Sequence, residues 1–121
     1  MSKQLNDSVN VLRAPGVLAV TLNVDAAEDL PIEAMDGDGD FRYGDSPEDI
    51  AHDNLRRAGF AAIGVHAFAK RTGLLGGEDM HTTLSDLLCD LHHLADAIDL
   101  DWDELLNRAD GHYEPEIRGE L

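Results

Sequence analysis

The fold of this chain is decided by residues 46–73, which read SPEDIAHDNLRRAGFAAIGVHAFAKRTG. Ser46 can cap a helix, the proline after it suits the first helical position, and the acids that follow favour the positive end of the helix dipole. Residues 58–69 carry no formal charge, which is typical of a buried helix. Gly73 is a suitable C-cap. The pattern predicts a central helix over about residues 47–72.

Two further helices are predicted after the central one. Leucines spaced by three and four residues predict an amphipathic helix over about residues 83–98, capped by Thr83. A third helix, over about residues 102–113, begins after Asp101, with a glutamate at the capping-box position. Because the link between these helices is short, we expect them to be antiparallel neighbours. We expect the polar tail from Glu114 onward to fray.

A β-like segment and an acidic stretch precede the helices. Residues 17–24 alternate with a period of two and are rich in β-branched side chains, which predicts a short strand. Its partner is either a return strand near residues 41–43 or the same strand of a second chain, unless the segment is not a strand. Residues 25–45 read as an acidic linker, and residues 1–15 as a flexible arm. We therefore expect a mainly α fold, a single helical domain over residues 16–121 with a three-helix core.

The length and charge of the chain bound its function. Its 121 residues suit one domain, and 25 acidic against 9 basic side chains give a net charge of −16. This balance argues against direct binding of nucleic acid or of an anionic membrane, both of which need clustered lysine and arginine. There is no membrane-length apolar run and no apolar signal core. With Cys89 as the single cysteine, we expect a protein of the reducing cytoplasm.

The acidity has an unusual composition, because aspartate outnumbers glutamate by 17 to 8. One physical setting for this halophilic composition is a salt-rich cytoplasm, where ions screen the repulsion between carboxylates. Another is a protein that presents carboxylates to a basic partner, including one that imitates the phosphates of DNA. Part of the excess also caps helices, which favours solvent adaptation as the reason for the rest.

Two groups of acidic residues are candidate metal ligands. Asp36, Asp38 and Asp40 match the first three ligand positions of a calcium loop, although the later positions of that loop do not match. The alternative is an acidic, glycine-rich loop without a metal.

The second group lies on the second predicted helix. Asp86, Asp90 and His93 fall on one stripe, opposite the leucines, where they could hold a divalent ion such as Mg²⁺. The alternative is a solvated polar face. The sequence shows no phosphate loop, nucleophile elbow or Cys-x-x-Cys pair, so we expect no catalytic residues and no cofactor.

The C-terminal third carries two resemblances. The runs LSDLLCDLHHLAD (84–96), LDWDELL (100–106) and ADGHYEPE (109–116) resemble the C-terminal part of small uncharacterised proteins carried by phages and plasmids. The same stretch is distantly similar to MazG-like nucleotide pyrophosphohydrolases. That similarity implies an all-helical, oligomeric fold with Mg²⁺ held by E-E-x-x-E and E-x-x-D motifs.

Aligned on the leucines, the MazG-like motifs are incomplete. The second motif falls on Thr83 to Asp86, so threonine replaces its glutamate. The first falls on Glu48 to His52, with histidine in place of its final glutamate. Two of the five expected carboxylates are therefore missing, and such a site should bind Mg²⁺ poorly.

These observations favour a small acidic accessory protein of the mobile-element type, which acts by contacting another protein. The self-pairing strand and the small residues of the central helix also favour a homodimer. The alternatives are a MazG-like Mg²⁺-dependent nucleotide pyrophosphohydrolase and a DNA-mimic inhibitor of a nucleic-acid-binding protein.

Overall fold

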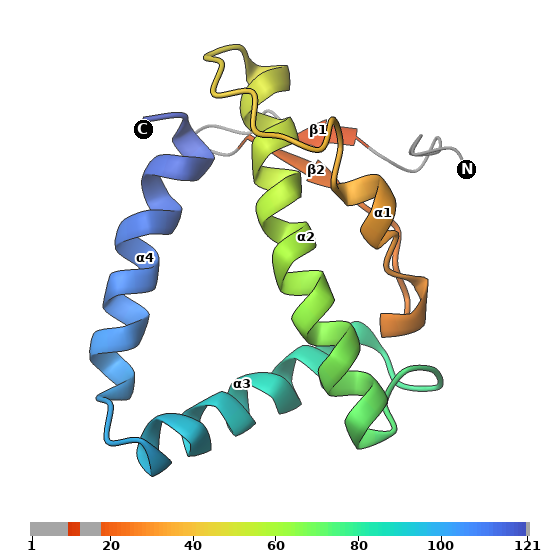
Figure 1. The fold of residues 1–121 in the computed structure, drawn as a ribbon, viewed down its shortest axis with the longest axis vertical. Coiled ribbons are helices and arrows are strands. Elements are labelled where there is room, and N and C mark those ends of the chain that lie inside the picture. The colour runs from red at the N-terminus through yellow and green to blue at the C-terminus, as the bar shows by residue number, and fades with distance from the viewer. Residues whose placement is uncertain (1–9, 13–17, 121) are drawn as a thin grey trace.

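The chain folds as a mainly α protein with three long helices, as the sequence predicts (Figure 1). The computed structural model describes residues 10–12 and 18–120. The long helices are α2 (Pro47–Thr72), α3 (Met80–Ala97) and α4 (Trp102–Arg118). Before them come strands β1 (Asn10–Leu12) and β2 (Ala19–Thr21), the 3₁₀ turn η1 (Ala27–Asp29) and the short helix α1 (Ile32–Met35).

Helix α2 begins and ends where its local sequence predicts. The Ser46 hydroxyl accepts a hydrogen bond from the backbone N–H of Asp49 at 3.1 Å, which satisfies one free donor of the first turn. Gly73 closes the helix in the left-handed region with φ 79°, a conformation that a side chain would strain.

The predicted strand is present but shorter, and its partner differs from the two that we expected. β2 pairs antiparallel with β1, with Val11 opposite Val20. Residues 41–43 form no strand, because the backbone N–H groups of Arg42 and Tyr43 instead donate to the carboxylate of Asp53. The rest of the predicted arm, residues 1–9 and 13–15, lies outside the described residues.

The stretch predicted as an acidic linker, residues 25–45, supplies part of the core instead. Ala27 of η1 is fully buried against α2, and Met35 of α1 is almost fully buried. Two buried clusters result, each built on α2: Ala27 with Val65 and Ala69, and Met35 with Leu55 and Ala62. The acidic stretch therefore carries a few apolar residues that are spaced to reach the same helix.

Helix α3 begins three residues before the predicted start. Asp79 is its N-cap, with its carboxylate accepting from the backbone N–H of Thr82 at 2.7 Å. Hydrogen bonds from the backbone and the side chain of Thr82 hold the pKa of Asp79 below its usual 3.8. Thr83, the predicted cap, lies inside the helix and is fully buried. Aspartate and threonine are both good N-cap residues. Here Asp79 is the N-cap of α3, and Thr83 is buried within the helix.

Helix α4 continues past the predicted end, through Glu114 and Pro115, to Gly119 at φ 70°. The tail is not frayed as far as this glycine, because it is fastened to α2 and to the residue before β2. The backbone N–H of Leu18 donates to the carbonyl of Ile117 at 2.8 Å, and the side-chain amide of Asn54 donates to the carbonyl of Glu116 at 3.0 Å.

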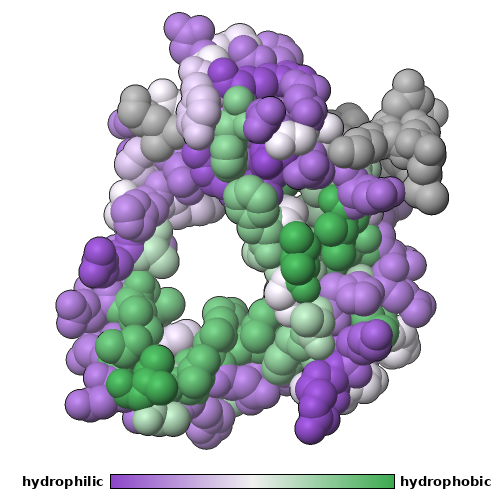
Figure 2. Space-filling view, viewed as in Figure 1, coloured by the Kyte–Doolittle hydropathy of each residue, from purple (hydrophilic) through white to green (hydrophobic). Residues whose placement is uncertain are grey.

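The long helices form three sides of an open frame (Figure 1). In the space-filling view, an opening passes between α2, α3 and α4 (Figure 2). Helices α3 and α4 diverge from their link instead of packing as the antiparallel neighbours that we expected. Asp99 turns the chain with φ 62°, and α4 runs from this corner back to α2, where its far end is held.

Candidate interaction surface

A polar cluster at the start of α2 is the first candidate site. Asp53 is 5% exposed, and its carboxylate accepts three hydrogen bonds of 2.9 Å, from the backbone N–H groups of Arg42 and Tyr43 and from Nδ1 of His52. Burial alone would raise the pKa of Asp53, but the hydrogen bonds outweigh it and hold the pKa below 3.8. The ionised carboxylate therefore ties the preceding loop to α2.

His52 completes this tie. Its Nδ1 donates to Asp53, and its Nε2 accepts the backbone N–H of Asp38 at 3.0 Å, which assigns the neutral Nδ1–H tautomer. The carboxylate of Asp38 in turn accepts a hydrogen bond from Nε of Arg42 at 2.7 Å, which lowers the pKa of Asp38. Both ring nitrogens of His52 are engaged, so the cluster acts as a clamp for the loop.

The candidate calcium ligands lie in this loop, and two of their carboxylates face arginines. Asp36 accepts a hydrogen bond from Nη1 of the buried Arg56 at 2.6 Å, and Asp38 is paired with Arg42. Asp40 is exposed. Among residues 10–12 and 18–120, no group of three or more His, Cys, Asp or Glu side chains is placed to hold a metal ion.

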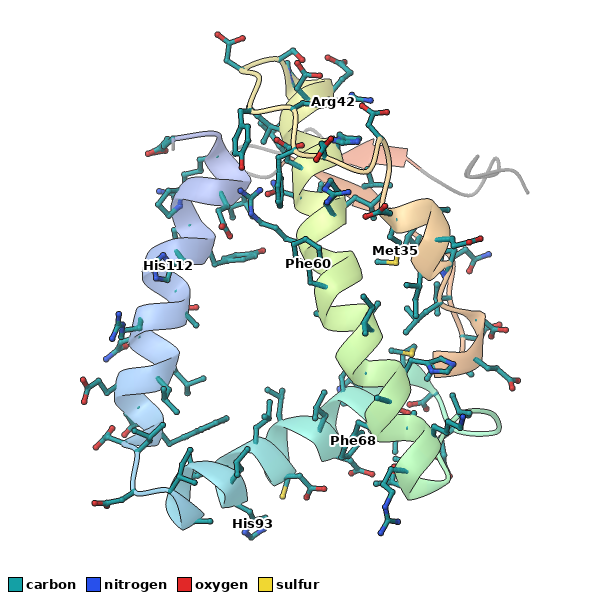
Figure 3. The ribbon with its side chains drawn as sticks, in the orientation of Figure 1. Met35, Arg42, Phe60, Phe68, His93 and His112 are labelled. Carbon is teal, nitrogen blue, oxygen red and sulfur yellow. The ribbon has the colours of Figure 1, made fainter. Side chains whose placement is uncertain are left out.

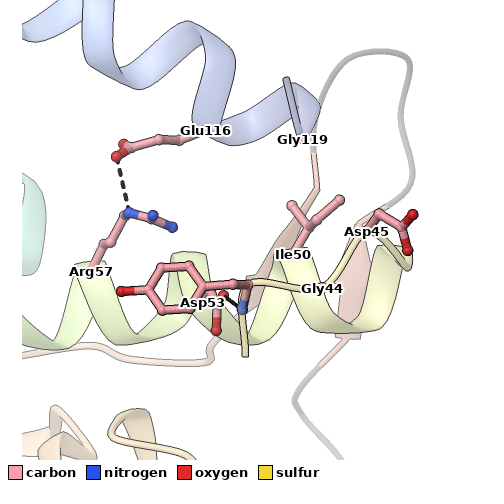
Figure 4. Close-up of a pocket in the computed structure, with 8 residues that line it drawn as sticks. Gly44, Asp45, Ile50, Asp53, Arg57, Glu116 and Gly119 are labelled. Atoms are coloured by element: carbon pink, nitrogen blue, oxygen red, sulfur yellow. Dashed lines mark hydrogen bonds and ion pairs between the residues drawn. The ribbon is translucent and has the colours of Figure 1, made fainter. Parts of the chain in front are cut away.

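A cavity of about 270 Å³ opens beside the clamp, between α2 and the end of α4 (Figure 4). Arg57 crosses it and pairs with Glu116, with 2.9 Å between Nε and Oε2. Arg57 also donates to the side chain of Asn54 at 3.0 Å. The main charged groups in the cavity therefore fasten α4 to α2.

The candidate ligands on α3 lie on its exposed surface. Asp86 and Asp90 are exposed and line a shallow hollow near the C-terminal end of α2. His93 is also exposed and points away from the opening (Figure 3). The residues aligned with the other MazG-like motif, Glu48 to His52, lie in the first turns of α2. The hollow beside Asp86 lies near the other end of α2, about 30 Å away along the helix at 1.5 Å per residue. One chain does not bring the two motifs together.

The most extensive candidate site is apolar. Large apolar side chains follow the sides of α3 and α4 that border the opening, and green surface lines it in Figure 2. Each is 38–57% exposed. Together with two residues of the link between these helices and two of α2 they form what we term the frame face: Phe60, Ile63, Leu84, Leu88, Leu91, Leu94, Ile98, Leu100, Leu105, Leu106 and Tyr113.

The part of α2 in the frame face lies opposite its buried side. Phe60 borders the opening in Figure 3, and the neighbouring exposed positions on this side are uncharged. They are Ile63, Gly64 and Ala67. The opposite side holds the buried residues Ala62, Val65 and Ala69. The charge-free half of α2 is therefore covered on one side only, whereas its sequence predicts burial all round.

The leucines of α3 follow the helical period that the sequence predicts, but this period does not show which surface covers them. Phe60 and Ile63 lie in a stretch whose lack of charge predicts burial, and both are exposed. α3 buries only Thr83 and Ala95, and α4 buries none of its residues.

Compared with known proteins, the chain matches no family model, no curated protein and no solved structure. Within the described residues, none of the helices has the length and apolar character that crossing a membrane requires.

Proposed function

We propose that this protein acts without catalysis, as a small acidic accessory protein that associates with protein through the frame face. The observation that carries the proposal is the exposure of eleven large apolar side chains on α2, α3, α4 and the link between α3 and α4, with apolar surface lining the opening in Figure 2. A monomeric protein rarely exposes a contiguous apolar patch of more than a few hundred Å².

The size of the frame face suits a protein partner. Eleven half-exposed large apolar side chains together offer several hundred Å² of apolar surface. Each side of a standard interface contributes about 800 Å², of which roughly 57–65% is apolar. The apolar area is therefore of the order that one side of a stable interface buries.

The polar groups near the start of α2 support the same proposal, because they bind one another and the loop before the helix. Asp53, His52 and Asp38 are engaged with the loop that they hold, and Arg57 and Glu116 are engaged with each other. A catalytic site needs such groups directed at a substrate. Here they stabilise the scaffold that carries the frame face.

A pair of adjacent substitutions tests the proposal. Leu94→Glu puts a charge on the frame face, and His93→Glu puts the same charge on the outer side of α3. Tagged wild-type and variant chains are captured from native cells and analysed by native mass spectrometry, after circular dichroism has checked their helix content. Wild-type and His93→Glu chains should form a stoichiometric complex, with the same or another chain, that Leu94→Glu abolishes. Three monomeric chains without a partner would refute the proposal.

The catalytic alternative has its own measurement. Pyrophosphate release from a panel of nucleoside triphosphates is followed with Mg²⁺ or Mn²⁺, and the expected result is no turnover above background. Turnover that disappears in Asp86→Ala would overturn the proposal in favour of a MazG-like hydrolase.

A further inference from the structure

We infer that the hollow between α1 and α2 binds a small neutral molecule that has an apolar body and one carbonyl oxygen, as in an amide. The hollow has a volume of about 330 Å³, and Arg56 of α2 lies in its wall. This inference goes beyond the proposed function and does not depend on it, because a chain without a protein partner could still hold such a molecule.

An unsatisfied donor of Arg56 is the observation that carries the inference. The side chain of Arg56 is 8% exposed, and its Nη1 donates both to the backbone carbonyl and to the carboxylate of Asp36. Its Nε is buried and has no hydrogen-bond partner among the described residues. A buried donor on a charged group costs stability when it is left without an acceptor. Arg56 therefore has a donor to offer to an oxygen from outside the chain.

Two aromatic rings hold the guanidinium of Arg56 without satisfying Nε. Its Cζ lies 5.0 Å from the ring centroid of Phe41 and 5.7 Å from that of Phe60. An aromatic ring is a weak hydrogen-bond acceptor compared with oxygen. Phe60 also lines the hollow and is 53% exposed, so its ring can turn outward and admit the oxygen of a ligand to Nε.

The remaining walls of the hollow suit an apolar body. Ile32 of α1 and Phe60 and Ile63 of α2 line it, and Gly59 lets the ligand approach the backbone of α2. Pockets for small molecules begin at about 300 Å³, and a cavity of roughly 150 Å³ holds benzene. The hollow therefore has room for one ring and a short polar substituent.

Charge favours a neutral molecule over an ion. Asp36 already neutralises Arg56, with 2.6 Å between Oδ1 and Nη1, and Glu33 adds a second carboxylate to the same hollow. An anion would meet both acids, and burying an ion costs far more than burying an amide. A basic group would not accept the hydrogen bond that Nε offers. A neutral carbonyl oxygen satisfies the donor and brings no charge.

Three ring compounds of similar size test the inference on the whole chain. They are benzamide, benzoate and toluene, which carry a neutral acceptor, an anionic acceptor and no acceptor. An NMR titration follows the backbone amide of Gly59 and the side-chain Nε–H of Arg56. Benzamide should bind saturably in the millimolar range and shift both signals. Benzoate and toluene should bind about tenfold more weakly or not at all.

Substitutions locate the site. Ile63→Trp fills the hollow, and Ile98→Trp makes the same change at an exposed isoleucine outside it. The first should raise the dissociation constant of benzamide about tenfold or more, and the second should leave it unchanged. Arg56→Lys keeps a charge for Asp36 but removes Nε, so it should reduce benzamide binding to that of toluene. Because Arg56 is buried, circular dichroism checks each fold, and Ile63→Trp keeps the test decisive if the lysine variant does not fold.

Several results would overturn the inference. Toluene that binds as tightly as benzamide would show that Nε plays no part. Benzoate that binds more tightly than benzamide would replace the neutral ligand with an anion. Benzamide that binds equally well to Ile63→Trp, or that leaves the Nε–H signal of Arg56 unmoved, would place binding outside the hollow. No saturable binding at millimolar concentration would remove the site altogether.

Discussion

Asp53 shows how one residue can organise a loop that has no regular structure. Its carboxylate binds two consecutive backbone N–H groups, those of Arg42 and Tyr43, and the ring of His52. Tyr43 has φ 53°, a left-handed conformation that a tyrosine rarely adopts, and this carboxylate holds its N–H. From the sequence, Asp53 was one of many acids in the first turns of a helix. Its role depends on which backbone groups the fold brings to it.

Asp53→Asn should lower the free energy of unfolding by about 2–3 kcal/mol at pH 7, the size of a buried hydrogen bond to a charged group. An amide offers one acceptor oxygen where the carboxylate offers two, and its NH₂ group faces a backbone donor. Urea denaturation followed by circular dichroism measures the loss. Asp38→Asn is the matched control, because Asp38 is 59% exposed and solvent screens its pair with Arg42, so this variant should lose much less stability than Asp53→Asn.

The same carboxylate gives a pH dependence. Because the pKa of Asp53 is lower in the folded chain than in the unfolded chain, its stabilisation is complete above the unfolded value, near 3.9. The stabilisation is lost as the pH falls through the folded value. Below about pH 4 the wild type should therefore lose stability more steeply than Asp53→Asn. Parallel curves for the two chains would contradict this role of Asp53.

At the scale of elements, a helix begins at the predicted N-cap wherever the sequence offers only one good capping residue. Ser46 and Asp101 cap α2 and α4 as predicted, because an N-cap needs only its own side chain and a backbone N–H three residues on. Asp79 caps α3 in place of Thr83, which lies within the helix and is fully buried. The extension of α4 through Pro115 likewise depended on contacts made by Glu116 with α2.

Gly111 gives a prediction at this scale. It lies inside α4, and a Cβ built on it meets nothing within 4 Å. Gly111→Ala should therefore raise the free energy of unfolding by about 0.5–1 kcal/mol, because alanine loses less backbone entropy in a helix. Thermal unfolding measures the change.

Gly119→Ala is the matched control, with the opposite sign. Gly119 has φ 70°, and a Cβ there would collide with Ile50, so this variant should be destabilised. Two variants that move in the same direction would contradict the assignment of Gly111 as a position without contacts.

At the scale of the whole molecule, the acidic surface and the frame face act against each other. A net charge of −16 disfavours both compaction and association, whereas eleven exposed apolar side chains favour association. Salt changes this balance in one direction, because it screens the repulsion and leaves apolar burial in place. The composition typical of halophilic proteins would then have a direct consequence for assembly.

The urea midpoint of unfolding should therefore rise steadily between about 0.1 and 1 M NaCl, because added salt screens the repulsion between the carboxylates. Replacing Asp86 and Asp90 together by asparagine removes two charges from the exposed surface of α3 and should reduce this slope. A midpoint that is flat or falls with salt would show that the carboxylates do not oppose folding.

The sequence by itself determined the three helices, most of their ends and the existence of a strand, because caps, helical periodicity and alternation are local properties of the chain. Only the tertiary structure decided that residues 25–45 contribute Ala27 and Met35 to the core, that Asp53 holds their loop, and that α3 and α4 diverge around an opening. The reason is physical: an apolar period shows which side of a helix avoids water, but it does not show which surface will cover that side. Here the leucines of α3 and α4 find little cover within their own chain.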